Sequence, residues 1–289
     1  MNVGIIGLGL MGGSIGRAAV RTEKHKVFAF DIDEESMVKG SLLKAYHERL
    51  THDNAHELDL LILAVLPSAV PALLDEYLPL LKSGATVTDI AGVKRHVVET
   101  MTEYSAKYPD ISFVGGHPMA GREFSGVAHS TAGLLENSTV LLVSVKTPLD
   151  ALARLKEFYK ELGAEGVVIT TADDHDKMIA YTSQLAHVVS SAYVKSEAAS
   201  RHYGYSAGSF RDMTRVARMN PAMWTELMSD NADNLIPEIR GIAARLNEYA
   251  DSLENADKEC LYRLLDEGNR MKLSVEKDRQ KKLNDALDD

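Results

Sequence analysis

A glycine-rich segment near the start of the chain could bind a dinucleotide. It matches the pattern Gly-x-Gly-x-x-Gly. Gly7 permits a tight turn, Gly9 lets the backbone approach a pyrophosphate, and Gly12 lets a helix pack closely on a strand. A helix that begins here would also direct the partial positive charge of its N-terminus at the phosphates. The predicted pyrophosphate site consists of Gly7, Leu8, Gly9, Leu10, Met11 and Gly12.

Asp31 stands where the same cofactor would need an acid. It directly follows the apolar run Lys26–Phe30 and lies about 20 residues after the glycines, as the acidic residue does in dinucleotide-binding domains. A carboxylate there accepts hydrogen bonds from both hydroxyls of the adenosine ribose and repels a 2′-phosphate. We therefore expect NAD rather than NADP. Asp33 is a nearby alternative, with a better claim to capping a helix that begins near Glu34.

Val65 lies near the end of a third apolar run, Leu58–Val65. In a doubly wound sheet the strand ends lie at the ligand crevice, so this turn is expected to border the cofactor. The alternative is an ordinary strand exit that Pro67 stops.

One histidine has a setting that suits catalysis. His117 follows the short apolar run Ser112–Val114, with Gly115 and Gly116 before it and Pro118 after it. The glycines leave the imidazole on a thin, open backbone, and the proline limits where it can point. Histidine titrates near neutral pH, so His117 is a candidate base presented into a crevice.

The elements that must position these residues alternate along the first 170 or so positions. Short apolar runs are separated by amphipathic segments such as Ser68–Leu81 and Leu149–Leu162. This alternation predicts crossover connections and a mainly parallel sheet. The expected strands are Val3–Ile6, Lys26–Phe30, Leu58–Val65, Thr86–Ile90, Ser112–Val114, Thr139–Val145 and Gly166–Ile169.

The chain after Thr170 lacks any strand pattern and is expected to be all-helical. A long helix is predicted over Ala172–Ser200, capped by Asp173 or Asp174. Further helices are predicted near Ala207–Arg218, Asn231–Leu253 and Ala256–Leu287, with Pro221 and Pro237 near helix starts. Two domains are therefore expected, residues 1–170 and residues 171–289.

Three arginines in the second half could bind an anion. Arg211, Arg215 and Arg218 are spaced i, i+4, i+7 and would share one helix face. Asp212 could pair with Arg215. The alternative is a solvated, ion-paired face, which is the usual fate of such runs.

Composition excludes several classes of protein. The 289 residues carry 32 Lys and Arg against 42 Asp and Glu, a net charge of −10, which disfavours a nucleic-acid binder. No stretch approaches the roughly 18 to 20 apolar residues of a membrane span. The single cysteine, Cys260, excludes an intrachain disulfide and favours a cytoplasmic setting. No metal site is expected, because no Cys/His cluster has zinc spacing.

The segment Gly115–Gly126 resembles the signature of the prephenate and arogenate dehydrogenases of tyrosine biosynthesis. The resemblance extends to Gly7–Ser14, His175-Asp176, Ser183–His187 and the stretch from Phe210 to Trp224. It implies an N-terminal Rossmann domain, with a doubly wound sheet, followed by an all-helical dimerisation domain. It also implies oxidative decarboxylation of prephenate to 4-hydroxyphenylpyruvate, with hydride transfer to NAD⁺, by a homodimer.

The resemblance also assigns roles to particular residues. His117 would hydrogen-bond the carbinol hydroxyl of prephenate and accept its proton. Arg215 would bind a substrate carboxylate, and His187 would contact substrate. Arg211, four residues before Arg215, is a further candidate for substrate binding on its spacing. Trp224 could reach a pocket across the dimer, or be a core residue.

The sequence departs from the family pattern at two positions. Gly92 replaces a serine whose hydroxyl would bind the carbinol oxygen and the catalytic histidine. Arg122 stands where the family often carries a small hydroxyl residue. Its guanidinium could bind a substrate carboxylate or a cofactor phosphate, or it could fold out against Glu123. No strand-rich regulatory domain is expected.

Other functions stay open at this point. Arogenate is an alternative substrate. A β-hydroxyacid dehydrogenase shares the Gly-Leu-Gly-x-Met-Gly opening, but it would need a catalytic lysine for which Lys195 is a poorly supported candidate. A non-catalytic NAD-sensing protein gains some support from the missing serine.

Overall fold

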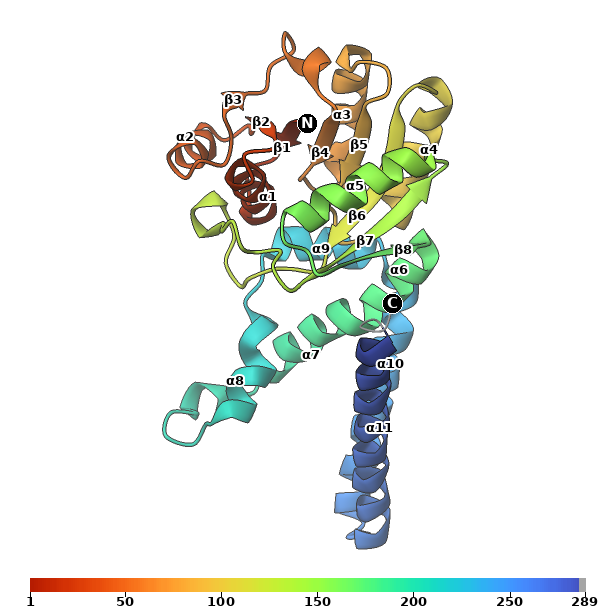
Figure 1. The fold of residues 1–289 in the computed structure, drawn as a ribbon. Helices are drawn as coiled ribbons and strands as arrows, with labels where there is room; N and C mark the ends of the chain where they lie inside the picture. Colours follow the sequence, from red (N-terminus) through yellow and green to blue (C-terminus); the bar gives the residue numbers. More distant parts are fainter. Residues whose placement is uncertain (286–289) are drawn as a thin grey trace. The chain divides into compact units, whose positions relative to one another are not determined.

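The computed structural model describes the backbone of residues 1–285 and the side chains of residues 1–277. The chain forms two compact units, residues 1–235 and residues 236–289. The first unit holds a sheet with helices on both faces and a set of shorter helices (Figure 1). The second is helical. In the part of the chain that is described, no helix is long and apolar enough to cross a membrane.

Eight strands form one sheet in the order β3-β2-β1-β4-β5-β6-β7-β8. Their bounds are β1 Asn2–Ile6, β2 Lys26–Phe30, β3 Glu48–Arg49, β4 Leu60–Leu63, β5 Thr86–Asp89, β6 Ser112–Pro118, β7 Thr139–Val145 and β8 Gly166–Thr170. All neighbouring pairs are parallel except β6 and β7. The order reverses at β1, next to β4, which creates the crevice at the strand ends where doubly wound folds bind ligands. The predicted fold class is confirmed.

Helices cover both faces of this sheet. They are α1 Leu10–Arg21, α2 Glu34–Leu42, α3 Val70–Tyr77, α4 Arg95–Lys107 and α5 Leu149–Glu161. Short 3₁₀ turns lie at Ala55–Glu57, Pro67–Ala69, Leu78–Leu80 and Val127–His129. The helix predicted over Ser68–Leu81 is thus shorter, with 3₁₀ turns at Pro67–Ala69 and Leu78–Leu80 flanking it. Asp33 caps α2, as its position predicted.

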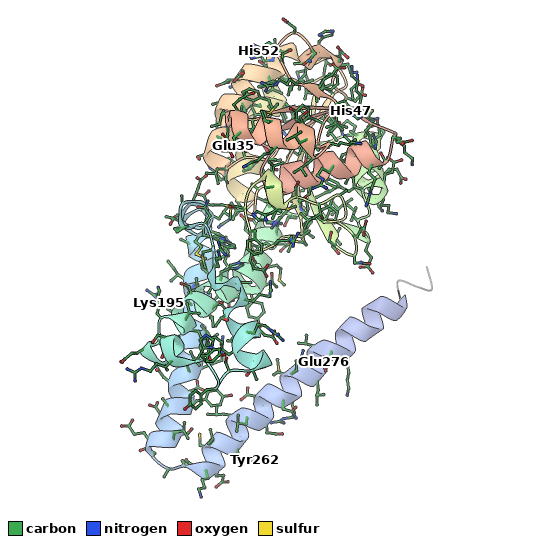
Figure 2. All side chains as sticks on the ribbon, turned by 90° about the vertical axis from the view of Figure 1, so that its left-hand side faces the viewer. Glu35, His47, His52, Lys195, Tyr262 and Glu276 are labelled. Atoms are coloured by element: carbon green, nitrogen blue, oxygen red, sulfur yellow. The ribbon has the colours of Figure 1, made fainter. Side chains whose placement is uncertain are left out.

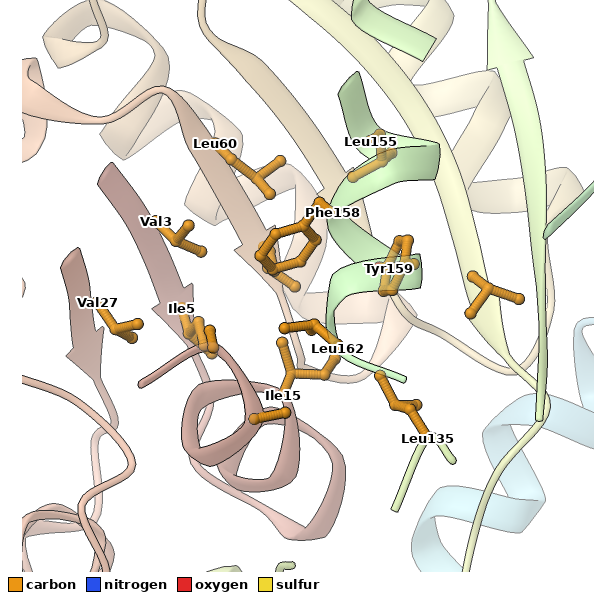
Figure 3. Packing of buried hydrophobic residues seen from close by; sticks show 14 of the residues in the cluster. Val3, Ile5, Ile15, Val27, Leu60, Leu135, Leu155, Phe158, Tyr159 and Leu162 are labelled. Atoms are coloured by element: carbon orange, nitrogen blue, oxygen red, sulfur yellow. The ribbon is translucent and has the colours of Figure 1, made fainter. Parts of the chain in front are cut away.

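The core has two layers because successive strand residues point to opposite faces. Ile5 and Ile15 pack with Phe158 and Leu155 of α5 on one face (Figure 3). Residues of β4, α3 and α4, such as Leu61, pack on the other. These layers fix the strand ends that carry the candidate site.

Strand β6 is longer than the sequence indicated. It continues through His117 and Pro118, because its second half pairs antiparallel with β7, His117 opposite Leu141. The expectation that His117 follows the strand is therefore wrong. The strand backbone fixes its position.

The helical part of the first unit departs from one long helix. α6 (Ala172–Ile179) passes through a π-helical turn at Ala180–Gln184 into α7 (Leu185–Val194), so the helix predicted to Ser200 ends early. Thr171, rather than Asp173 or Asp174, caps α6 through the backbone N–H of Asp174. A 3₁₀ turn at Glu197–Arg201, α8 (Gly208–Thr214), a 3₁₀ turn at Arg215–Ala217 and α9 (Pro221–Ser229) follow.

Two prolines lie in the helices of this region. Pro221 opens α9, so its predicted place near a helix start is confirmed, although no helix was predicted between Arg218 and Asn231. Pro237 lies inside α10 (Ala232–Glu254), in the second turn from its start. α11 spans Lys258–Asp285 and carries Tyr262 and Glu276 (Figure 2). The last residues of the helix predicted to Leu287 lie outside the described residues.

Candidate active site

The glycine-rich turn has the geometry that a pyrophosphate needs. Gly7 has φ +98°, which favours glycine, and a side chain there would collide with the Ala64 carbonyl. A Cβ on Gly12 would lie 1.9 Å from the Gly7 oxygen. A Cβ on Gly9, by contrast, would meet nothing within 4 Å, so the backbone there is open to a ligand. The residues present therefore fit a dinucleotide.

Asp31 lies beside this turn with its carboxylate oriented by the backbone. Oδ2 accepts a hydrogen bond from Leu8 N at 2.6 Å, and Oδ1 accepts one from Asp33 N at 2.8 Å. Val65 follows β4, and its Cγ1 would lie 3.2 Å from a Cβ on Gly7. The structure thus brings the predicted cofactor residues of β1, β2 and β4 together.

A chain of three polar side chains runs inward from β6. His117 Nδ1 lies 2.9 Å from His175 Nε2, and His175 Nδ1 lies 2.7 Å from Asp176 Oδ1. His117 is half-buried, whereas His175 and Asp176 are almost completely buried. The arrangement joins the strand that carries His117 to helix α6 of the helical segment.

The hydrogen bonds fix the form of each ring. Asp176 accepts from His175 Nδ1–H, which leaves His175 Nε2 with a lone pair. His175 Nε2 in turn accepts from His117 Nδ1–H. We therefore assign the neutral His117 a free lone pair on Nε2, which is the form that a general base requires.

Burial and charge keep both rings neutral. Burial, the Lys94 ammonium and His175 hold the pKa of His117 well below its ordinary value, although Asp176 acts in the opposite direction. Burial also lowers the pKa of His175, against the raising effect of its hydrogen bond to Asp176. The Asp176 pKa is lowered through bonds to His175 and to backbone N–H groups, which outweigh its burial. At neutral pH the three hydrogen-bonded side chains His117, His175 and Asp176 are therefore two neutral imidazoles and a carboxylate.

Asp176 is held by backbone and side-chain donors. It accepts hydrogen bonds from Lys94 N at 2.7 Å and Arg95 N at 2.9 Å. Its own carbonyl accepts from Asn231 Nδ2 at 2.8 Å. In the sequence, His175-Asp176 stands out only as part of a motif that resembles the family. The adjacent His-Asp pair on a capped helix was the signal that could have indicated this role.

Arg215, His187 and Trp224 form a second group. The ring of His187 packs against Trp224 with centroids 3.9 Å apart, and His187 Nδ1 lies 2.9 Å from the Ser183 carbonyl oxygen. Burial and the positive charge of Arg215 lower the pKa of His187, against the effect of the Ser183 carbonyl. Arg215 Nη1 lies 2.7 Å from Glu123 Oε1, so Arg215 pairs with Glu123 and not with Asp212, which its spacing had offered as a possible partner.

The other predicted cations are not brought together. α8 ends at Thr214 and a 3₁₀ turn follows, so Arg211, Arg215 and Arg218 do not share one helix face as predicted. Arg218 lies over the Phe124 ring, 5.3 Å from its centroid. Arg211 and Arg122 are exposed, and Glu123 faces Arg215 rather than folding against Arg122.

Gly92 lies beside helix α9. A Cβ there would lie 3.2 Å from Leu227 Cδ1, so a side chain would require a small shift of Leu227. No hydroxyl is available at this position, and His117 Nδ1 is bonded to His175 instead.

Lys195 has a setting that does not suit catalysis. It lies exposed at the end of α7 (Figure 2).

Two family models and the curated relatives match the same family. A model described as "Prephenate dehydrogenase, nucleotide-binding domain" matches residues 15–168, and one described as "Prephenate dehydrogenase, dimerization domain" matches residues 171–267. A cyclohexadienyl dehydrogenase of Zymomonas mobilis is 29% identical over 96% of this chain and 97% of its own length. A prephenate dehydrogenase of Bacillus subtilis is 30% identical over 90% of this chain and 72% of its own.

A solved structure extends the likeness to the fold. Prephenate dehydrogenase from A. aeolicus, in complex with hydroxyphenyl propionate and NAD⁺, has a TM-score of 0.81 and 29% identity. The match covers 95% of this chain and 98% of that one.

Proposed function

The chain belongs to the prephenate dehydrogenase family, and we propose that it oxidises prephenate with NAD⁺ by using His117 as the base. In this reaction hydride leaves the carbinol carbon for NAD⁺, the ring carboxylate leaves as carbon dioxide, and the ring becomes aromatic. The product is 4-hydroxyphenylpyruvate. Aromatisation supplies the driving force, so the protein must hold the substrate, take a proton and exclude misaligned geometries.

The observation that carries this proposal is the chain His117–His175–Asp176. Its hydrogen bonds leave the lone pair of His117 Nε2 free, and the lowered pKa keeps that lone pair available at neutral pH. As hydride departs, Nε2 accepts the carbinol proton, and Asp176 stabilises the resulting positive charge through His175. When the carbon–carbon bond to the carboxylate breaks, its electron pair enters the ring. The oxygen, now phenolic, can take the proton back.

We propose that Arg215 binds a substrate carboxylate. Its guanidinium is 62% exposed at the side chain and already pairs with one carboxylate, that of Glu123. A substrate carboxylate would exchange for Glu123 and make the same charge-assisted hydrogen bond. Arg211 lies one turn earlier, exposed, as the second cation of this proposal.

His187 would contact the substrate in its neutral form. Because Nδ1–H donates to the Ser183 carbonyl, Nε2 is left as an acceptor. An acceptor suits a substrate hydroxyl better than a carboxylate. Trp224, which packs on His187, would shape the same region.

The cofactor site is assigned to the turn Gly7–Gly12, with Asp31 at the adenosine ribose and Val65 at the edge of the crevice. NAD⁺, when bound, supplies the hydride acceptor. The open backbone at Gly9 and the fixed Asp31 carboxylate support this assignment.

The proposal also covers the oligomeric state of the protein, its domain boundary and its location in the cell. We infer a homodimer formed through the helical half, which is supported by the match of residues 171–267 to a dimerization-domain model. The domain boundary after residue 170, between β8 and α6, stays a prediction, as do the cytoplasmic location and the binding of a substrate carboxylate by Arg122.

A direct test measures NADH formation and carbon dioxide release with prephenate, arogenate and small β-hydroxyacids. The proposal expects turnover of prephenate with equal amounts of both products. Oxidation of a β-hydroxyacid alone, or NAD⁺ binding without turnover of any of these compounds, would contradict it.

A further inference from the structure

Lys94 and Asp89 form an ion pair that is fully buried. Both side chains are at most 1% exposed, and Lys94 Nζ bonds to Asp89 Oδ2 and to the Val93 carbonyl. Removing two charges from water is costly, and a neutral pair of similar volume is often as stable. Stability alone therefore gives no reason for this pair, which lies at the end of β5 where the candidate site begins.

Asp89 connects the pair to the strand that carries His117. Its Oδ1 accepts a hydrogen bond from Gly116 N at 3.2 Å, and its Oδ2 accepts one from Ala91 N at 2.8 Å. Gly116 directly precedes His117. A Cβ on Gly115 would lie 3.1 Å from Lys94 Cδ, so the lysine stem packs against the same strand.

Lys94 also connects to the other end of the polar chain. Its backbone N–H donates to Asp176 Oδ1 at 2.7 Å, the same oxygen that His175 Nδ1 contacts. Two routes therefore lead from Lys94 to His117. One passes through Asp89 and the Gly116 backbone, and the other passes through Asp176 and the His175 ring.

We propose that Lys94 is a positioning residue for His117. The ammonium group of Lys94 supplies a fixed positive charge near the imidazole, and the backbone N–H of Lys94 anchors Asp176. The proposal rests on the assignment of His117 as the base. The charged or titratable groups that face His117 are Lys94, from the loop before α4, and His175 and Asp176, from α6. Burial lowers the pKa of His117 most, Lys94 and His175 lower it further, and Asp176 raises it.

The charge of Lys94 affects the protonation state of His117 before substrate binds. A fixed cation opposes protonation of the ring by solvent, so the base is free before substrate binds. Asp89 neutralises much of the lysine charge, which allows the cation to be buried at all. The buried pair thus lowers the stability of the fold but keeps the His117 imidazole in its neutral form.

The experiment compares pH profiles of kcat/KM for prephenate. Lys94→Gln removes the charge but keeps an amide donor, and Lys94→Met/Asp89→Asn replaces the pair by neutral groups. Both keep the backbone N–H that binds Asp176. In Lys94→Gln, loss of the cation should move the acidic limb to higher pH and lower kcat/KM at the acidic end by roughly three- to tenfold relative to the variant's own alkaline plateau. The double variant also loses the Asp89 charge, so its acidic limb should move in the same direction by a smaller amount.

Two controls separate charge from packing. Lys94→Arg keeps the positive charge and should keep the parent's acidic limb. Lys82→Met removes an exposed lysine that pairs with Asp59 at 2.6 Å and should leave the profile unchanged. Thermal unfolding shows which variants fold.

A folded Lys94→Gln or Lys94→Met/Asp89→Asn variant with the parent's acidic limb would overturn the proposal. The outcome is distinguishable from failure of the base assignment, because His117→Asn would then still be inactive. If His117→Asn were active instead, the base assignment itself would fail.

Discussion

His117 Nδ1 and His175 Nε2 lie 2.9 Å apart, although 58 positions separate the two residues in the chain. The contact joins the last part of β6 to α6. It makes the nucleotide-binding sheet and the helical segment contribute to one reactive group. A base on the sheet is thereby oriented by a buried His-Asp pair on a helix.

Removing the orienting ring should impair the base without removing it. His175→Phe keeps an aromatic ring but loses both nitrogens, so the imidazolium of His117 loses a charge-assisted hydrogen bond of about 1.5–3 kcal/mol. We expect kcat to fall roughly 10- to 150-fold, with NAD⁺ affinity unchanged. His52→Phe, at an exposed histidine paired with Glu76, is the control. Unchanged kcat in a folded His175→Phe variant would show that the hydrogen bonds from His117 to His175 and Asp176 do not act in catalysis.

Cofactor preference should depend on Asp31. Asp31→Ser removes the charge that repels a 2′-phosphate, so the ratio of kcat/KM with NADP⁺ to that with NAD⁺ should rise. Asp33→Ser keeps a helix cap two positions away and should leave the ratio as it is. A parent enzyme that uses NADP⁺ as well as NAD⁺ would refute the assignment.

Arg215→Ala should chiefly weaken substrate binding. The lost interaction is worth about 1.5–3 kcal/mol, so KM for prephenate should rise about 10- to 150-fold if binding is lost uniformly. Arg201→Ala serves as the control, because Arg201 makes an exposed pair with Glu197 four positions before it. An unchanged KM would move the carboxylate anchor to Arg211, Arg218 or Arg122.

Stability should fall as the pH drops, because the histidine chain is buried in its neutral form. Burial lowers the pKa of His117 and of His175 in the folded state, so below about pH 6.5 the unfolded chain binds more protons than the folded one. The stabilisation is complete above that pH and is lost as the pH falls through the folded pKa values. The free energy of unfolding, measured with urea at several pH values, should depend less steeply on pH in His117→Asn than in the parent, by up to about 1.4 kcal/mol per pH unit. Equal slopes would mean that the pKa of His117 is not lowered in the folded protein.

The sequence predicted the sheet well because its strands are short, apolar and separated by amphipathic helices. It also predicted the Gly7–Gly12 turn and the cap at Asp33, which depend on local backbone chemistry. It failed where tertiary contacts decide. Strand β6 extends to Pro118 only because β7 pairs with it, and the π-helical turn at Ala180–Gln184 has no local signal that we identified.

The site shows the same division. His117 could be singled out because its glycine neighbours are adjacent in sequence. Its contact with His175 could not be predicted, because that contact forms only when α6 packs on the end of the sheet. The pairing of Arg215 with Glu123 is equally non-local, since these residues are 92 positions apart, so the sequence offered only the nearby Asp212 as a possible partner.

The central claim is that His117 is the base for prephenate oxidation, and His117→Asn tests it most directly. The measurement is kcat with saturating prephenate and NAD⁺, together with NAD⁺ affinity by titration. We predict that kcat falls by roughly 10²–10⁴-fold, the usual contribution of a general base, while NAD⁺ affinity stays close to that of the parent. A folded His117→Asn variant whose kcat stays within a few-fold of the parent would contradict the account.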